Sequence, residues 1–154
     1  MSNQTFMSNW TQITADDLKA AGHGMIVDKA RTTASGGVDP VDSAIADAVS
    51  RVRRSVAAGN ALDVDPAKIP ASLRGITIRI AVFALMERIR LPLSDDQKKS
   101  REFDNSDLLR VADRKTPVEE PDVPAGNAEM QSSGGAQGIN VPHRQTGRHK
   151  CSGL

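Results

Sequence analysis

The longest apolar run in the chain lies between Pro70 and Pro92, and its pattern predicts a buried helix. Pro70 suits the first helical turn, where its missing N–H would have no partner. Pro92 ends the run, because the residue before a proline is driven out of the α region. A helix over this span would have about 22 residues and a length of roughly 33 Å. Alternation at 76, 78 and 80 also fits a short strand, but the length favours a helix.

The apolar side chains of this predicted helix fall on two opposite faces. One face consists of Ile78, Val82, Leu85 and Ile89. The other consists of Leu73, Ile76, Ile80 and Phe83. A helix that is apolar on two sides is buried between neighbours. Two interpretations follow: the chain covers both faces itself, or the face with Ile78, Val82, Leu85 and Ile89 packs against another subunit as an interface.

The N-terminal third predicts two short helices. Thr14, followed three residues later by Asp17, has the spacing of a capping box and begins the first helix. Gly22 and Gly24 break it, and residues 25–33 continue as a second short helix.

Two further helices begin at clear capping signals. Asp39 and Pro40 open a helix with one apolar stripe, which Gly59 ends as a left-handed cap would. Ser94, with Gln97 at the capping-box position, opens a mostly solvated helix that runs to about residue 113. The whole pattern predicts an all-α fold, a small bundle of about four helices.

Composition divides the chain into three parts. Residues 1–12 are polar and are expected to be flexible, and translation could start at Met1 or at Met7, since both begin the triplet MSN. Residues 13–115 hold the helical domain. Residues 116–154 are rich in proline and glycine, cannot bury enough apolar surface to offset their ordering entropy, and predict an extended or disordered C-terminal arm.

The totals restrict the class of protein. The 154 residues fit one small domain with tails, and the net charge of +1 points to neither a nucleic acid nor an acidic partner. The single cysteine, Cys151, excludes an intrachain disulfide framework. Charged residues interrupt the apolar run at 79, 87 and 88, which argues against a membrane span. The first residues do not resemble a signal peptide, so we expect an intracellular protein or one assembled into a particle inside a cell.

No motif predicts catalysis, a cofactor or a metal. The DNSD stretch at 104–107 resembles half of a calcium loop but lacks the required glycine and glutamate. His149 and Cys151 are too isolated for a zinc site, and no glycine-rich phosphate loop is present. We therefore predict a protein that is not an enzyme, with no catalytic, cofactor-binding or metal-binding residues.

Basic residues offer an alternative function, a small helical regulator that binds DNA or a partner helix. The candidates for phosphate contacts are Arg51, Arg53, Arg54, Arg74 and Arg79. Residues 38–93 hold eight basic and six acidic residues, a net charge of only +2, whereas a DNA-binding domain usually has a stronger basic footprint. The loop over 60–69 is also too long for a helix-turn-helix.

Several segments of the sequence occur in an order found in one protein family. They are ITADDL (13–18), VDPVDSAIADAVSRVR (38–53), IPASLR (69–74), LMERIRLPLS (85–94) and SDLLRVAD (106–113). A proline-rich exit follows. This order resembles the small helical head–tail connector, or neck adaptor, proteins of tailed bacteriophages and prophages, and the resemblance covers residues 13–120.

The resemblance implies a structural role in the neck of a virion that is assembled in the host cytoplasm. Copies of such proteins form a homo-oligomeric ring, commonly a dodecamer, beneath the portal protein. The ring extends the channel through which DNA passes without sequence-specific binding, and it docks the next neck or tail protein. The arm over 116–154 would contact a neighbouring copy or the portal.

Overall fold

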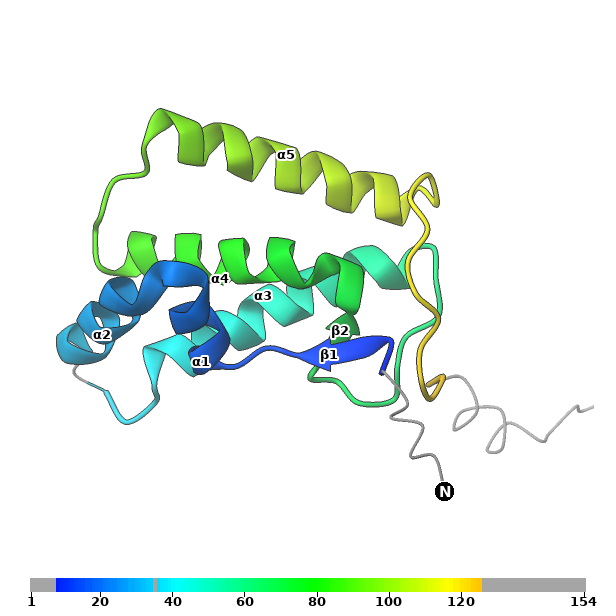
Figure 1. The fold of residues 1–154 in the computed structure, drawn as a ribbon, viewed down its shortest axis with the longest axis horizontal. Helices are drawn as coiled ribbons and strands as arrows, with labels where there is room; N and C mark the ends of the chain where they lie inside the picture. Colours follow the sequence, from blue (N-terminus) through cyan, green and yellow to red (C-terminus); the bar gives the residue numbers. More distant parts are fainter. Residues whose placement is uncertain (1–7, 35, 126–154) are drawn as a thin grey trace, which may run out of the picture.

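A computed structural model describes residues 8–34 and 36–125. The helices are α1 (Ala15–Leu18), α2 (Gly24–Thr33), α3 (Pro40–Ala57), α4 (Arg74–Arg88) and α5 (Asp95–Ala112). A π-helical segment, η1 (Lys19–His23), joins α1 to α2, so these three form one N-terminal arm with a kink at Gly22. The prediction of a small all-α bundle of about four helices is confirmed (Figure 1).

Helix α4 lies in the middle of the bundle. It packs against α3 along its length, with α5 above it and the α1–α2 arm in front (Figure 1). Its buried residues are Ile76, Thr77, Ile78, Ala81, Val82, Phe83, Leu85 and Met86. A single chain therefore covers α4 on both of its apolar faces.

The predicted subunit interface on α4 is wrong for this fold. Ile78, Val82 and Leu85 are 5%, 2% and 0% exposed within one chain, and Ile89 packs partly buried against the same core. The physical reason is that α2 and α5 contribute buried side chains of their own, such as Val27 and Val111. Little of this face is left for another subunit.

The predicted start of the long helix is also wrong. Lys68–Pro70 form a strand, β2, and the helix α4 begins only at Arg74, after a 3-10 turn, η2 (Ala71–Leu73). Strand β2 pairs antiparallel with β1 (Trp10–Gln12), with Trp10 opposite Pro70. Trp10 and Ile69 are 1% and 0% exposed, so the extended pairing brings two large side chains into the core. That burial outweighs the helical preference of the local sequence.

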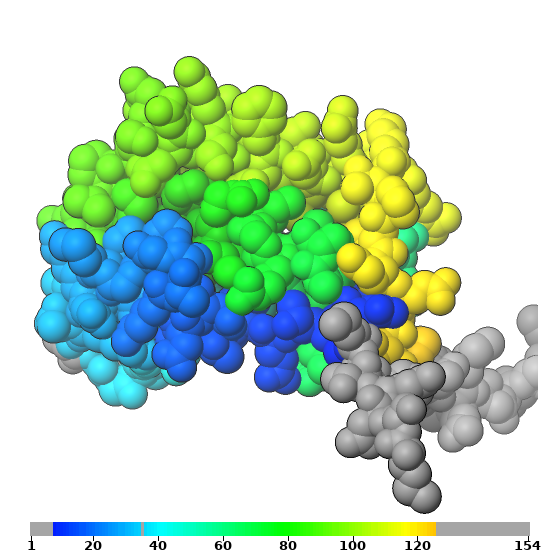
Figure 2. Space-filling view, viewed as in Figure 1, coloured from blue at the N-terminus to red at the C-terminus, as the bar shows by residue number. Residues whose placement is uncertain are grey.

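The predicted domain boundaries at 12 and 115 need correction. Trp10–Gln12 were expected to be flexible but form β1. Residues 116–125, here called the strap, were assigned to a separate arm but pack on the domain (Figure 2). The Trp10 Nε1 donates a hydrogen bond to the Glu119 carbonyl at 3.1 Å, and the Asn9 N–H donates to Asp122 Oδ1 at 3.0 Å. Residues 1–7 and 126–154 of the predicted tails lie outside the described part of the chain.

The last two helices end in the same motif. At the end of α4 the Leu91 N–H donates to the Met86 carbonyl and the Arg90 N–H to the Glu87 carbonyl, which is the Schellman pattern. The end of α5 repeats it around Arg114. Both arginines have left-handed backbones, with φ of 55° and 60°, where glycine is usual.

Gly59 does not form the predicted left-handed cap, since Gly22 alone among the described glycines has a positive φ. Close approach explains Gly59 instead. A Cβ there would lie 2.7 Å from Arg114 Cγ and 3.0 Å from the Ala112 carbonyl oxygen. The glycine lets the end of α5 rest on the end of α3.

Candidate docking surface

An open apolar groove runs along one side of α3, and we call it the α3 groove. Its volume is about 710 Å³. Residues 13–15 form one wall, and Leu62, Pro66 and Ala67 form the other. The lining residues of α3 extend from Asp42 to Ala57, a distance of about 22 Å at 1.5 Å per residue.

The sequence of α3 explains why this side is apolar and shallow. Its core stripe includes Val41, Ala44, Ala48, Val52 and Val56, which are all at most 1% exposed. The groove lies beside this stripe, over Ile45 and Val49 and the exposed alanines Ala46 and Ala57. Small side chains on the floor leave space that a larger residue would fill.

Arg53 fixes the wall of the groove that is formed by the loop before β2. Its guanidinium donates to the carbonyl oxygens of Asp63 (2.8 Å), Asp65 (2.9 Å) and Lys68 (2.6 Å). The guanidinium also lies over the Trp10 ring. Because one planar group holds three carbonyls, the loop has little freedom to close over the groove.

Two aspartates complete the same wall. Asp63 is 1% exposed, and its carboxylate accepts hydrogen bonds from the N–H groups of Asp65 and Val123, which ties the loop to the strap. Hydrogen bonds from the Ala67 N–H and the Gln12 side chain lower the pKa of Asp65 below its ordinary value of 3.8. Asp65 is therefore ionised at neutral pH and holds the base of the loop.

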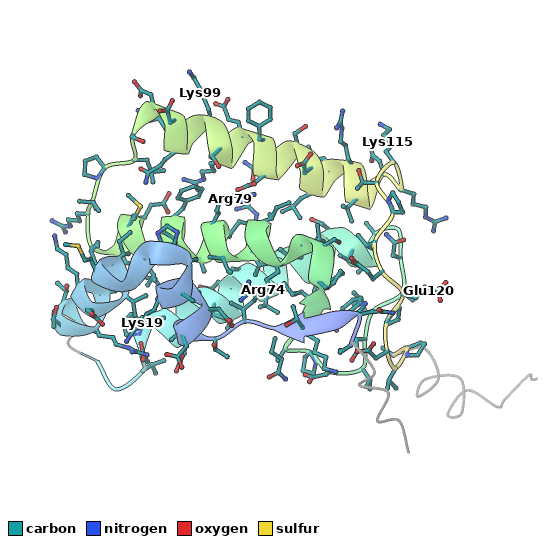
Figure 3. All side chains as sticks on the ribbon, in the orientation of Figure 1. Lys19, Arg74, Arg79, Lys99, Lys115 and Glu120 are labelled. Carbon is teal, nitrogen blue, oxygen red and sulfur yellow. The ribbon has the colours of Figure 1, made fainter. Side chains whose placement is uncertain are left out.

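A second, smaller cleft of about 320 Å³ lies between α3, α4 and α5. Its charged residues are largely matched within the chain. Arg79, which Figure 3 shows between α4 and α5, binds the buried Asp104 with Nε at 2.9 Å and Nη2 at 2.6 Å. Arg101 donates to Glu87 at 2.5 Å, and Arg51 to Asn105 at 2.7 Å. These contacts join the helices and leave no obvious set of groups aimed at a substrate.

The stretch at 104–107 is thus part of α5 and not a calcium loop. Among residues 8–34 and 36–125, no cluster of three or more His, Cys, Asp or Glu side chains is arranged to hold a metal ion. His149 and Cys151 lie outside the described residues. Within the described ranges, no helix combines the length and apolar content needed to cross a membrane.

The candidate phosphate-binding arginines do not come together on one surface. Arg53 binds backbone carbonyls of the groove wall, and Arg79 binds Asp104. Arg51 binds Asn105, and Arg74 binds Asp17 at 2.6 Å. In the described part of the chain, Arg54 alone of the five makes neither a hydrogen bond nor an ion pair through its side chain. It stands exposed at the rim of the α3 groove.

The sequence interpretation placed the docking surface on α4, and the structure places an open apolar surface on α3. The signal was present as Ala46 and Ala57, which flank the core stripe, but alanines on a helix face carry little weight in a hydrophobic pattern. The opposing wall comes from segments distant in sequence. Comparison with protein-family models, with curated proteins and with solved structures yields no match for this chain.

Proposed function

We propose that this protein is a structural, non-enzymatic adaptor in the neck of a tailed phage particle. In this role copies form a ring under the portal, commonly a dodecamer, and dock the next neck or tail component while DNA passes through the channel. The segments that carry the family resemblance coincide with element boundaries. Asp39 and Pro40 begin α3, IPASLR leads through β2 into α4, and Ser94 caps α5.

The α3 groove is the observation that carries the proposal. It is open along about four turns of helix and apolar on its floor, a form that accepts a helix or an extended segment of another protein. Apolar surface of this kind on a small soluble domain usually marks an interaction site. The loop and strap hold the groove walls in place, so a partner would meet a preformed surface.

The DNA-binding form of the alternative receives less support, because four of its five candidate arginines are engaged within the chain. A ring adaptor needs no such basic surface. It needs apolar surface that remains open after the chain has folded, and the groove supplies this.

The experiment is to mix the chain with the portal protein encoded in the same genome and to measure complex formation by light scattering and electron microscopy. We expect rings stacked on the portal. Ala46→Arg, which fills the groove, should weaken assembly, while Ala20→Arg on the exposed side of η1 should not. A chain that stays monomeric and ignores portal rings at high concentration would overturn the proposal. A gel shift with DNA that weakens steeply with salt would favour the regulator instead.

A further inference from the structure

The outer side of α5 carries two exposed apolar side chains. Phe103 is 72% exposed and Leu109 is 66% exposed. With Ser106 between them they follow a spacing of three residues, which places them along one ridge of the helix. We call these three residues the α5 ridge. Lys99, four residues before Phe103 and so on the same side, points away from the bundle (Figure 3).

We propose that the α5 ridge of one copy packs into the α3 groove of the next copy. This inference rests on the ring of the proposed function. Helix α5 forms the upper edge of the domain in Figure 1, and the segments that wall the groove lie at its lower edge. Because the ridge and the groove lie on opposite sides of the domain, they cannot contact each other within one chain. A contact between them requires a second copy. A contact between two different patches of identical chains is heterologous, and repeating it closes a ring when the rotation allows.

The groove is long enough to hold the ridge. Phe103 and Leu109 are about 9 Å apart along the helix axis, and the groove is about 22 Å long. The two side chains lie on one i±3 row of α5, and such a row can pack into a groove on another helix. The alanines on the floor, Ala46 and Ala57, leave room for the two larger side chains.

The charges beside the two surfaces also favour a contact between the α5 ridge and the α3 groove. Arg54 is exposed at the groove rim, and Glu102 is exposed beside Phe103. Within the described residues neither side chain forms an ion pair. Opposite charges at the edge of an apolar contact fix its register, and they become partners when the ridge enters the groove.

The first test is a charge exchange in the full chain, with self-association measured by sedimentation. Arg54→Glu and Glu102→Arg should each weaken association by about tenfold, and the double variant should recover most of the loss. Glu120→Arg is the matched control, since Glu120 is exposed on the strap, away from both surfaces (Figure 3). A double variant no better than the weaker single one would overturn the inference, as would a wild-type chain that does not self-associate alone or on portal rings.

The second test is disulfide trapping in a Cys151→Ser background. Ala57→Cys combined with Leu109→Cys should give a ladder of linked chains on oxidation, and neither single cysteine should do so. Dimers from Leu109→Cys alone would indicate an α5-to-α5 contact and would overturn the inference. A third chain carries Ala57→Cys and keeps Cys151. An intrachain disulfide between these two cysteines would identify the C-terminal segment as the occupant of the groove and would also overturn the inference.

The outcomes separate the inference from the function on which it rests. Rings that assemble on the portal without the cross-link would refute the ridge-in-groove contact and leave the adaptor role intact. Cross-linked ladders that never engage the portal would refute the adaptor role instead.

Discussion

The guanidinium carbon of Arg53 lies 5.6 Å from the centroid of the Trp10 ring. This contact joins β1 to the C-terminal part of α3. The same guanidinium donates to the carbonyls of Asp63 and Asp65 in the loop before β2 and to that of Lys68 in β2. Trp10 in turn donates to the strap. Arg53 and Trp10 thus connect β1, α3, the loop before β2 and the strap.

Arg53→Lys is expected to lower the free energy of unfolding by about 2 kcal/mol. A lysine keeps the charge, but its single ammonium cannot reach three carbonyls in the geometry of a planar fork. Arg54→Lys is the matched control, because Arg54 is exposed one position along the same helix and should change stability by less than about 0.5 kcal/mol. Urea unfolding of both variants measures the difference, and equal losses would contradict the role assigned to Arg53.

A chain that ends at Lys115 is expected to melt well below the full-length protein. It loses the hydrogen bond from Trp10 to Glu119 and the bonds from Ser72 to the Glu119 carboxylate, and it leaves Asp63 without its Val123 partner. A chain that ends at Ala125 keeps all of these bonds and should retain its melting temperature.

Trp10 is the single tryptophan, so its fluorescence reports on the strap directly. The shorter chain should show a red shift of the Trp10 emission, because removing the strap exposes the indole side chain to water. Unchanged emission in that chain would mean that the strap does not cover Trp10 in solution.

Arg79→Ala is expected to cost about 3 kcal/mol of stability, because it leaves the carboxylate of Asp104, which is 2% exposed, without its bidentate partner. The double variant Arg79→Met, Asp104→Leu replaces the pair by apolar groups and should be much less destabilised than the single variant. Chemical unfolding of the two chains checks this order. A double variant as unstable as Arg79→Ala would contradict this explanation. It would show that the ion pair itself stabilises the fold, beyond preventing an unpaired buried charge on Asp104.

The helices could be predicted from the sequence because the signals that begin them are local. The side chains of Thr14 and Ser94 form capping boxes in the structure, and Asp39 caps α3 through the Val41 N–H at 2.8 Å. These signals depend on residues at most three positions apart. The fold class follows from them.

The errors arose where distant segments decide the conformation. Pro70 reads locally as a helix start, but its pairing with Trp10 makes it part of a strand. The ends of α4 and α5 lacked a glycine signal, since Arg90 and Arg114 occupy the left-handed positions. The strap reads as a polar tail until its contacts with Trp10 and Asp63 are known.

The candidate site was missed for a related reason. Helix α4 is apolar on two opposite faces, and each face must pack against other residues. The sequence does not show whether those residues belong to the same chain. Val27, Leu108 and Val111 cover much of α4, although the sequence of α5 predicted a mostly solvated helix. The open apolar surface then falls on α3, where the wall at 62–67 is set by Arg53 and not by any apolar pattern.

Stability is expected to fall below about pH 4. A hydrogen bond from the Val41 N–H, with support from Arg31, lowers the pKa of Asp39 below 3.8, and hydrogen bonds from Ser8 and Asn9 lower that of Asp122. The unfolded chain therefore binds protons at a higher pH than the folded chain does, and the stabilisation is lost as pH falls through the folded pKa values. Free energies of unfolding should be nearly constant from about pH 5 to about pH 8.

Asp39→Asn tests the assignment to one residue. Asparagine is an equally good helix N-cap but does not titrate, so α3 should still form while part of the acid dependence disappears. Urea unfolding at intervals from about pH 3 to about pH 7 compares the two chains. Parallel curves for wild type and variant across this range would show that Asp39 does not contribute to the acid transition, and the loss would then belong to the other aspartates with lowered pKa values, Asp17, Asp65 and Asp122.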